Sequence, residues 1–151
     1  MKYRNIGICV LLLCMLSGCF LRDRTTPYEF RQEFDQIASI EILRKETDSV
    51  LTDTPTHIIY TLNEADYKSF LDRLLEIEGG YAGSEPGTGF GMYIIRITYQ
   101  DGEMEMIGNY NNGYITPSGE VHQDVYRFDA NQYYAVLSDV LGKEITDWYY
   151  H

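Results

Sequence analysis

Cysteine is almost missing from this chain of 151 residues, and the three that occur lie near its start, at Cys9, Cys14 and Cys19. Residues 20–151 contain none. That stretch can therefore form no disulfide and no cysteine-ligated zinc site, and it holds no thiol nucleophile. Without disulfides a domain must be stabilised by its core alone, and about 130 residues are enough for such a core.

Basic residues are also scarce. The chain has 12 Lys and Arg against 23 Asp and Glu, a formal net charge of −11. Nucleic acids and anionic lipid surfaces are bound through basic patches. The composition therefore argues against a nucleic-acid partner and against binding of anionic lipid through the protein surface. The simplest interpretation of the acidic charge is solubility.

No hydrophobic run is long enough to span a membrane. The main apolar run, Ile6–Leu16, follows Lys2 and Arg4 and is about half of the ~20 residues that a transmembrane helix needs. A basic start, a short apolar run and then small residues are typical of a signal peptide. The run leads into Leu-Ser-Gly-Cys at residues 16–19.

This tetrapeptide resembles the lipobox of bacterial lipoproteins at all four positions. The resemblance implies that the Cys19 thiol receives a diacylglyceryl group and that a signal peptidase cuts between Gly18 and Cys19. The new amino group is acylated as well in many bacteria, and palmitate is among the expected chains. Two or more chains hold a protein stably. The expected location is therefore the cell membrane or envelope, with the domain facing outside the cytoplasm.

The chain then divides into three parts. Residues 1–18 are the expected lipoprotein signal peptide, and their removal lowers the net charge to −13 because two basic residues leave. Residues 19–26 comprise the lipidated Cys19 and a short tether, whose reach is ~25 Å when extended. Residues 27–151 form a single expected domain, for which no cofactor is predicted.

The first helix signal lies directly after the tether. Thr26 suits an N-cap, Pro27 the first turn and Glu29 a capping box. Aromatic and aliphatic residues follow at helical spacing. The pattern predicts a short helix over residues 27–35.

Two amphipathic helices are predicted further along the chain. Asn63 is the expected cap of the first, and the glycine pair at residues 79–80 its expected end. Asp129 is the expected cap of the second, which Gly142 would end. Trp148 to His151 are expected to form a short strand or a docked tail.

Strands are indicated by alternation and by β-branched and aromatic residues, over 37–43, 57–62, 92–99 and 103–110. In the last of these, two glutamates alternate with two methionines, which predicts acids on one face and thioethers on the other. Three hairpin turns are indicated, at Asp101-Gly102, Asn112-Gly113 and Ser118-Gly119.

The order of these elements predicts the α+β class. The expected architecture is an antiparallel sheet, a meander of about five to six strands, with the two amphipathic helices packed on one face.

Among candidate sites, the glycine-rich loop from Gly79 to Gly91 is the most conspicuous. It lacks a following Gly-Lys-Ser/Thr and leads into a strand rather than a helix N-terminus. A flexible connector is therefore favoured over a nucleotide site. A mobile flap over some other ligand is the remaining alternative.

Glu120, His122 and Asp124 alternate, so on one strand their side chains would share a face. They could ligate a divalent cation or supply acid–base chemistry. The simpler interpretation is the solvated face of an edge strand. No sequence pattern identifies a nucleophile or another catalytic residue.

Tyrosine is abundant, with nine of 14 at or after Tyr93. Tyrosine suits binding surfaces, but it also forms strands well and packs in cores. The residues expected to be most available are Tyr110, Tyr114, Tyr149 and Tyr150.

Three hypotheses follow. The first is a membrane-anchored, non-catalytic binding module for an envelope protein, peptide or glycan. The second is a small envelope enzyme that uses an acid–base or metal site at Glu120, His122 and Asp124. The third is a structural or regulatory subunit of an envelope complex.

Overall fold

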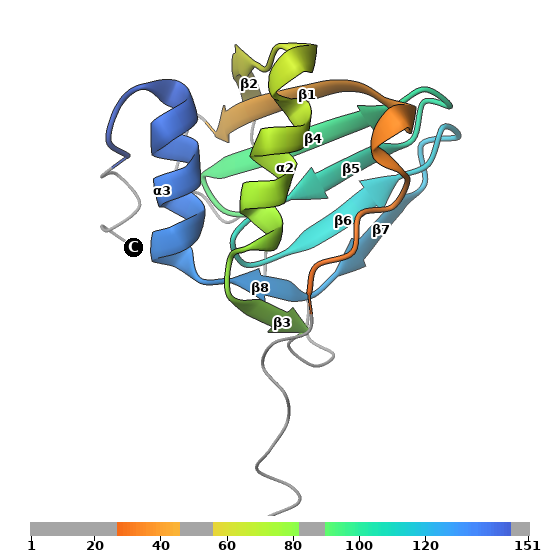
Figure 1. Ribbon diagram of the computed structural model, residues 1–151. Helices are drawn as coiled ribbons and strands as arrows, with labels where there is room; N and C mark the ends of the chain where they lie inside the picture. Colours follow the sequence, from red (N-terminus) through yellow and green to blue (C-terminus); the bar gives the residue numbers. More distant parts are fainter. Residues whose placement is uncertain (1–26, 46–55, 82–89, 146–151) are drawn as a thin grey trace, which may run out of the picture.

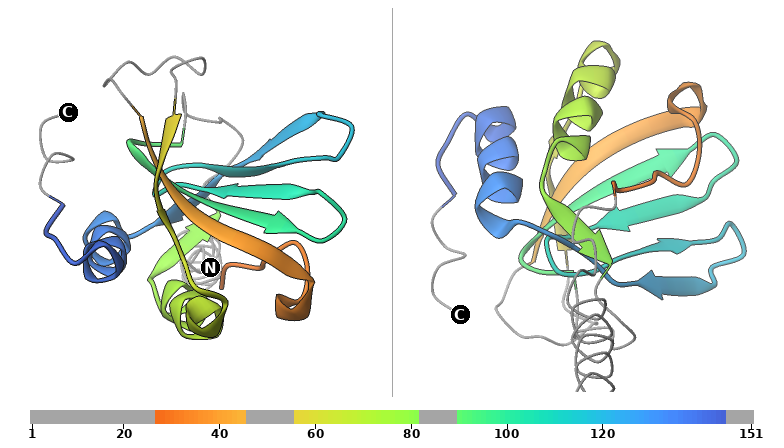
Figure 2. Two further views of the ribbon diagram at one scale, coloured as in Figure 1. Left: turned by 90° about the horizontal axis from the view of Figure 1, so that it is seen from above. Right: turned by 60° about the horizontal axis from the view of Figure 1, so that its bottom comes forward.

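The computed structural model describes residues 27–45, 56–81 and 90–145 (Figure 1). The predicted class is confirmed: the fold is α+β, with an antiparallel sheet of six strands and two α-helices on one of its faces (Figure 2). Within these residues no helix is both long and apolar enough to cross a membrane.

The main sheet has the strand order β2-β1-β4-β5-β6-β7, and every neighbouring pair is antiparallel. Its last four strands follow one another along the chain, which is the predicted meander. The bounds are β1 Ile37–Lys45, β2 Thr56–Thr61, β4 Tyr93–Tyr99, β5 Met104–Ile107, β6 Asn112–Ile115 and β7 Val121–Asp124. A second sheet pairs β3 (Gly79–Tyr81) with β8 (Tyr126–Phe128).

The core lies between the main sheet and the helices α2 (Tyr67–Leu75) and α3 (Ala130–Leu141). The helices turn their apolar faces to the sheet, as their spacing predicts. Each contributes side chains that are at most 7 % exposed, among them Phe70, Leu71 and Leu74 from α2 and Tyr133, Val136 and Leu137 from α3.

The ends of α3 match the sequence prediction. The Asp129 carboxylate accepts a hydrogen bond from the Gln132 backbone N–H at 3.0 Å. Gly142 follows the helix in the left-handed conformation, with φ of 64°. The start of α2 differs, because Asn63 makes no capping bond and a 3-10 turn, η2 (Glu64–Asp66), precedes the helix.

The predicted end of α2 at glycines 79 and 80 is wrong. The helix ends at Leu75, and the two glycines belong to β3. A Cβ on Gly79 would lie 2.6 Å from the Tyr126 ring, so the strand pair requires glycine there. These glycines allow close packing of two strands and do not cap a helix.

The predicted helix over residues 27–35 is wrong. The segment is irregular, with a bend at residues 31–32, up to a short 3-10 turn, η1 (Phe34–Gln36), which leads into β1. The Arg31 backbone N–H donates to the Glu105 carboxylate at 3.1 Å, a tertiary partner in place of a helical carbonyl. We call residues 27–33 the N-terminal strap, because they cross the end of the sheet beside α2 (Figure 1).

The turn predicted at Asn112-Gly113 is also displaced. The hairpin turn runs over residues 108–111, closed by a bond from Gly108 N–H to Asn111 C=O at 2.9 Å. Asn112 and Gly113 lie in β6. A Cβ on Gly113 would lie 2.2 Å from the His122 carbonyl oxygen, so this glycine permits close strand pairing. The turns at Asp101-Gly102 and Ser118-Gly119 fall where they were predicted, each with a glycine at positive φ.

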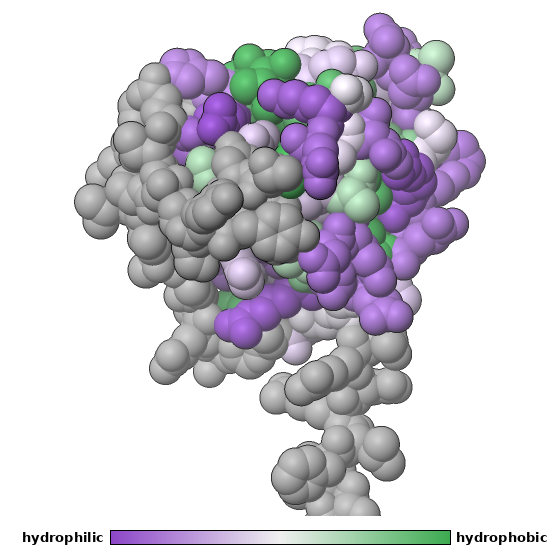
Figure 3. Space-filling view, turned by 90° about the vertical axis from the view of Figure 1, so that its left-hand side faces the viewer, coloured by the Kyte–Doolittle hydropathy of each residue, from purple (hydrophilic) through white to green (hydrophobic). Residues whose placement is uncertain are grey.

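The side of the molecule that carries α3 is largely hydrophilic over its described part, and its hydrophobic areas are small and separate (Figure 3). The predicted tail from Trp148 to His151 and most of the glycine-rich loop, residues 82–89, lie outside the described residues.

Candidate functional site

Three side chains form a row across the meander on the face that the helices cover. Glu105 of β5 pairs with Tyr114 of β6, and Tyr114 pairs with His122 of β7. Directly paired residues share a face, and residue 105 alternates with neighbours on the other face. Glu105 therefore lies on the face of β5 that the helices cover, and the methionines lie on the opposite face.

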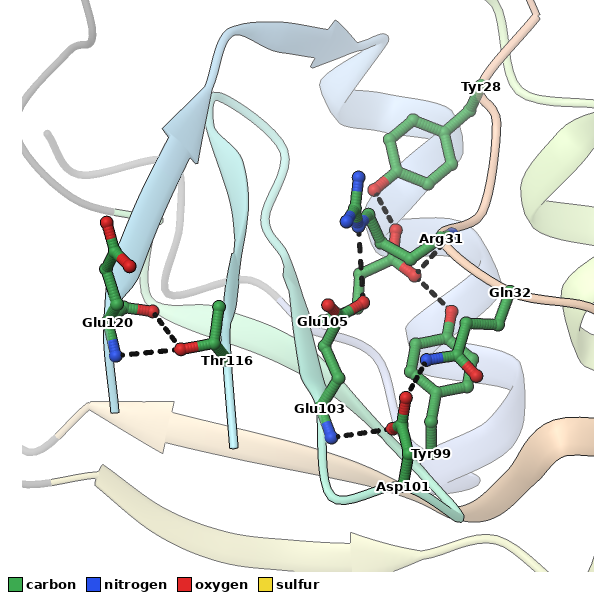
Figure 4. Close-up of polar contacts among 9 residues, drawn as sticks. All are labelled: Tyr28, Arg31, Gln32, Tyr99, Asp101, Glu103, Glu105, Thr116 and Glu120. Carbon is green, nitrogen blue, oxygen red and sulfur yellow. Dashed lines mark hydrogen bonds and ion pairs between the residues drawn. The ribbon is translucent and has the colours of Figure 1, made fainter. Parts of the chain in front are cut away.

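Glu105 is buried, with an exposed fraction of 1 %. The Tyr28 hydroxyl donates to its carboxylate at 2.5 Å, the Tyr99 hydroxyl donates to the other oxygen, and the Arg31 backbone N–H donates at 3.1 Å (Figure 4). Burial raises the pKa of Glu105, and these hydrogen bonds oppose that rise. Burial, followed by the nearby Glu105 charge, raises the pKa of both tyrosine hydroxyls.

This arrangement attaches the strap to the sheet. The Tyr28 ring also packs against Phe30, Tyr126 and Phe128, with ring centroids 5.0 to 5.4 Å apart. A carboxylate so enclosed has no surface with which to touch a ligand. Glu105 therefore positions the strap. The side chains that a ligand could contact lie in the exposed part of the row.

Arg31 extends from the strap to the exposed part of the row. Its Nε lies 3.2 Å from the Glu103 carboxylate, and a hydrogen bond to Glu103 raises the pKa of the guanidinium. Its Cζ lies 3.8 Å from the centre of the Tyr114 ring. This is a cation–π contact, and the Arg31 side chain remains 43 % exposed.

Tyr114 also stacks with His122. The two rings are 4.5 Å apart and 13° from parallel. His122 Nε2 lies 3.4 Å from the Glu120 carboxylate, and the two side chains are 38 % and 69 % exposed. The sequence suggested the tyrosines and the group of Glu120, His122 and Asp124 as two separate candidate sites. The two sites meet where Tyr114 stacks on His122. We call Arg31, Tyr114 and His122 the aromatic–cation stack.

Asp124 stands apart from this stack in its bonding. Its carboxylate accepts a hydrogen bond from the neighbouring Val125 backbone N–H at 2.8 Å. Among the residues that the structure describes, no group of three or more His, Cys, Asp and Glu is placed to hold a metal ion. The geometry therefore gives the suggested metal site at Glu120, His122 and Asp124 no support.

Tyr110 occupies the turn between β5 and β6, with 56 % of its surface exposed. Its two neighbours, Asn109 and Asn111, are at most 3 % exposed. The Asn109 side chain accepts from the Tyr134 hydroxyl at 3.3 Å, and its carbonyl accepts from Phe128 N–H at 3.1 Å. The turn is thus tied to the core and presents one tyrosine to solvent.

The other predicted site residues, Cys19, Tyr149 and Tyr150, lie outside the described residues. Comparisons with protein-family models, with curated proteins and with solved structures gave no match.

Sequence reasoning missed Arg31, Tyr28 and the burial of Glu105. One available signal was Ile107, which lies two residues after Glu105, shares its face and is fully buried. An acidic residue in step with a buried isoleucine is a candidate for a buried carboxyl with partners.

Proposed function

We propose that the chain is a lipid-anchored lipoprotein of a bacterial envelope, attached at Cys19, and that its domain is a non-catalytic binding module for a protein, peptide or glycan. The observation that carries the binding proposal is the aromatic–cation stack, a half-exposed phenol, imidazole and guanidinium held beside two carboxylates. Such groups contact apolar surface and donate or accept hydrogen bonds at once, which is typical of binding surfaces.

The lipobox-like residues 16–19 support the anchoring proposal. The described fold begins at Pro27, so an extended tether of residues 20–26 would hold the domain within ~25 Å of the membrane. The binding surface would then work close to the bilayer.

Mass spectrometry of the membrane-extracted protein tests the anchor. We expect a chain that begins at Cys19 and carries acyl groups, and a Cys19→Ala variant that leaves the membrane fraction. A water-soluble wild-type product with a free Cys19 thiol would refute the anchoring proposal.

Capture from envelope extract tests the binding module. We expect Tyr114→Ala to lose a component that the wild-type protein retains, because this change removes the centre of the stack. Tyr110→Ala separates the contribution of the exposed turn. If both variants and their combination retain every component that the wild type binds, the tyrosine surfaces are not the binding site.

An acid–base or metal enzyme is the weaker alternative. Its proposed residues are not convergent, because Asp124 is engaged with Val125 while Glu120 faces His122. No described observation favours it over the binding module.

A further inference from the structure

The outer edge of β7 leaves backbone hydrogen-bonding groups unpaired within the described part of the chain. β7 ends the strand order of the main sheet, so no described strand lies beyond it. The hairpin closes with a bond from Thr116 N–H to the Glu120 C=O at 2.9 Å. Because hydrogen-bonded pairs alternate in an antiparallel ladder, His122 and Asp124 bond β6, whereas Val121 and Gln123 direct their N–H and C=O groups outward.

The open part of this edge has a defined end. The next outward N–H, that of Val125, is already bonded to the Asp124 carboxylate at 2.8 Å. The available edge is therefore Val121–Gln123, with two donors and two acceptors. This is enough for a short added strand to form several main-chain hydrogen bonds.

One face beside this edge is apolar. Val121 pairs with Ile115, and Ile115 pairs with Met104, so the three side chains form a row on the face opposite to the helices. Val121 is 59 % exposed, and the other two are partly exposed. A strand added beyond β7 would extend this row with its own apolar side chains, because directly paired residues share a face.

The other face beside the edge is acidic. Glu120 and Asp124 flank the open segment and are exposed, and β7 itself carries no Lys or Arg. The whole chain has a net charge of −11. Basic side chains on this face of an added strand would complement that charge, whereas acidic ones would be repelled.

We propose that the outer edge of β7 binds an extended peptide segment of a partner protein in which apolar and basic residues alternate. The segment pairs with Val121 and Gln123 through the main chain, continues the Met104–Ile115–Val121 row on one face and places its basic side chains near Glu120 and Asp124 on the other. This inference rests on the proposed binding function and deepens it, since it names the partner as a peptide strand at the β7 edge, beside His122 of the aromatic–cation stack.

The test measures fluorescence anisotropy with the purified full-length protein in detergent and a labelled heptapeptide, Lys-Val-Lys-Val-Lys-Val-Lys. We expect saturable binding. The affinity should fall at least tenfold when glutamate replaces lysine in the peptide, and at least tenfold when alternate peptide nitrogens are methylated. Absence of binding, or equal binding of the methylated peptide, would overturn the proposal.

A matched pair of variants locates the site. Gln123→Pro removes an outward N–H without removing a bond to β6, and should weaken peptide binding at least tenfold. Gln123→Ala keeps the N–H and should bind within twofold of wild type. Equal affinity in both variants, with unchanged circular dichroism, would exclude the β7 edge.

Hydrogen exchange gives a readout that needs no variant. In the wild-type protein the Val121 and Gln123 amides should exchange at least tenfold more slowly when the peptide is bound. Unchanged exchange at both would contradict the proposal even if Gln123→Pro failed to fold. The peptide assay tests the β7 edge, whereas capture from envelope extract with Tyr114→Ala tests the aromatic–cation stack, so a failure of one proposal can be told from a failure of the other.

Discussion

Glu105 is a buried acidic residue on the face of the sheet that the helices cover. A lone carboxylate on an apolar sheet face would be costly to bury. Two tyrosine hydroxyls and one backbone N–H satisfy it, and one of these hydroxyls and the N–H come from the strap. The cost of burial is thus offset only when the strap is docked, so this residue couples the start of the domain to the middle of the sheet.

Substitution of Glu105 by Ala should therefore destabilise the protein strongly. Two buried hydroxyls and one partly buried N–H would lose their acceptor. Each buried donor left unsatisfied costs about 1–3 kcal/mol. We expect a loss of at least about 3 kcal/mol in the free energy of unfolding, measured by urea denaturation. Glu103→Gln, two residues before Glu105, breaks one partly exposed ion pair and should cost less than about 1 kcal/mol. Equal effects of the two changes would contradict the role assigned to Glu105.

The buried carboxyl should also leave a signature in the pH dependence of stability. Burial raises the pKa of Glu105 above its ordinary value of 4.5, so the folded protein holds this proton more tightly than the unfolded chain does. The contribution of Glu105 to the free energy of unfolding is then fully present below pH 4.5 and is lost as pH rises through the raised pKa.

The comparison that isolates this effect is wild type against Glu105→Gln, which has no proton to lose. The free energy of unfolding of the wild type minus that of the variant should fall as pH rises from 4.5 toward neutrality. A difference that is constant with pH, or that grows, would show that the pKa of Glu105 is not raised in the folded protein.

At the scale of elements, the strap shows how a local pattern is overridden. Its residues carry helix signals, but the backbone there is not helical, and the Tyr28 ring packs on the core and is 7 % exposed. The non-helical backbone also leaves the Arg31 N–H available to the Glu105 carboxylate. Packing and a buried hydrogen bond outweigh a capping preference that is worth about 1 kcal/mol.

The helix caps provide a matched test at this scale. Asp129→Ala removes the observed side-chain cap of α3 and should cost about 1 kcal/mol of stability, within the usual range of 0.5–2. Asn63→Ala removes a residue that occupies a cap position but makes no capping bond, and should cost less than about 0.5 kcal/mol. Thermal or urea unfolding measures both. A larger loss in the Asn63 variant would reverse the assignment of the caps.

At the scale of the whole molecule, the described part of the chain is held together by one core and by no disulfide. Residues 20–151 lack cysteine, so the core between the sheet and its two helices provides the stability. The open edge of β7 and the aromatic–cation stack both lie toward the end of the sheet where the strap is attached. Short length and flanking acids on β7 also limit unwanted strand pairing.

The absence of disulfides predicts that redox conditions do not alter stability. The midpoint of urea unfolding should be the same with and without a reducing agent, because no bond in residues 20–151 can be reduced. A midpoint that falls on reduction would contradict the prediction that no reducible bond stabilises the domain.

The sequence by itself determined those features that depend on neighbours along the chain. Alternation and β-branched or aromatic residues located β1, β2 and β4. The Asp-Gly and Ser-Gly pairs located two hairpin turns, and the i to i+3 pattern located the cap of α3. These features predict the α+β class because each arises from local backbone preference and from the facing of apolar residues.

Only the tertiary structure decided the environment of the polar residues. Whether Glu105 is solvated or buried depends on Tyr28, 77 positions away in the chain, and whether Tyr114 is free depends on Arg31 from the strap and His122 from the next strand. Likewise Gly79 and Gly113 allow neighbouring strands to approach closely, and turn patterns in the sequence do not predict this role. Side-chain burial and long-range pairing are properties of the assembled sheet, so a single sequence carries only weak signals of them.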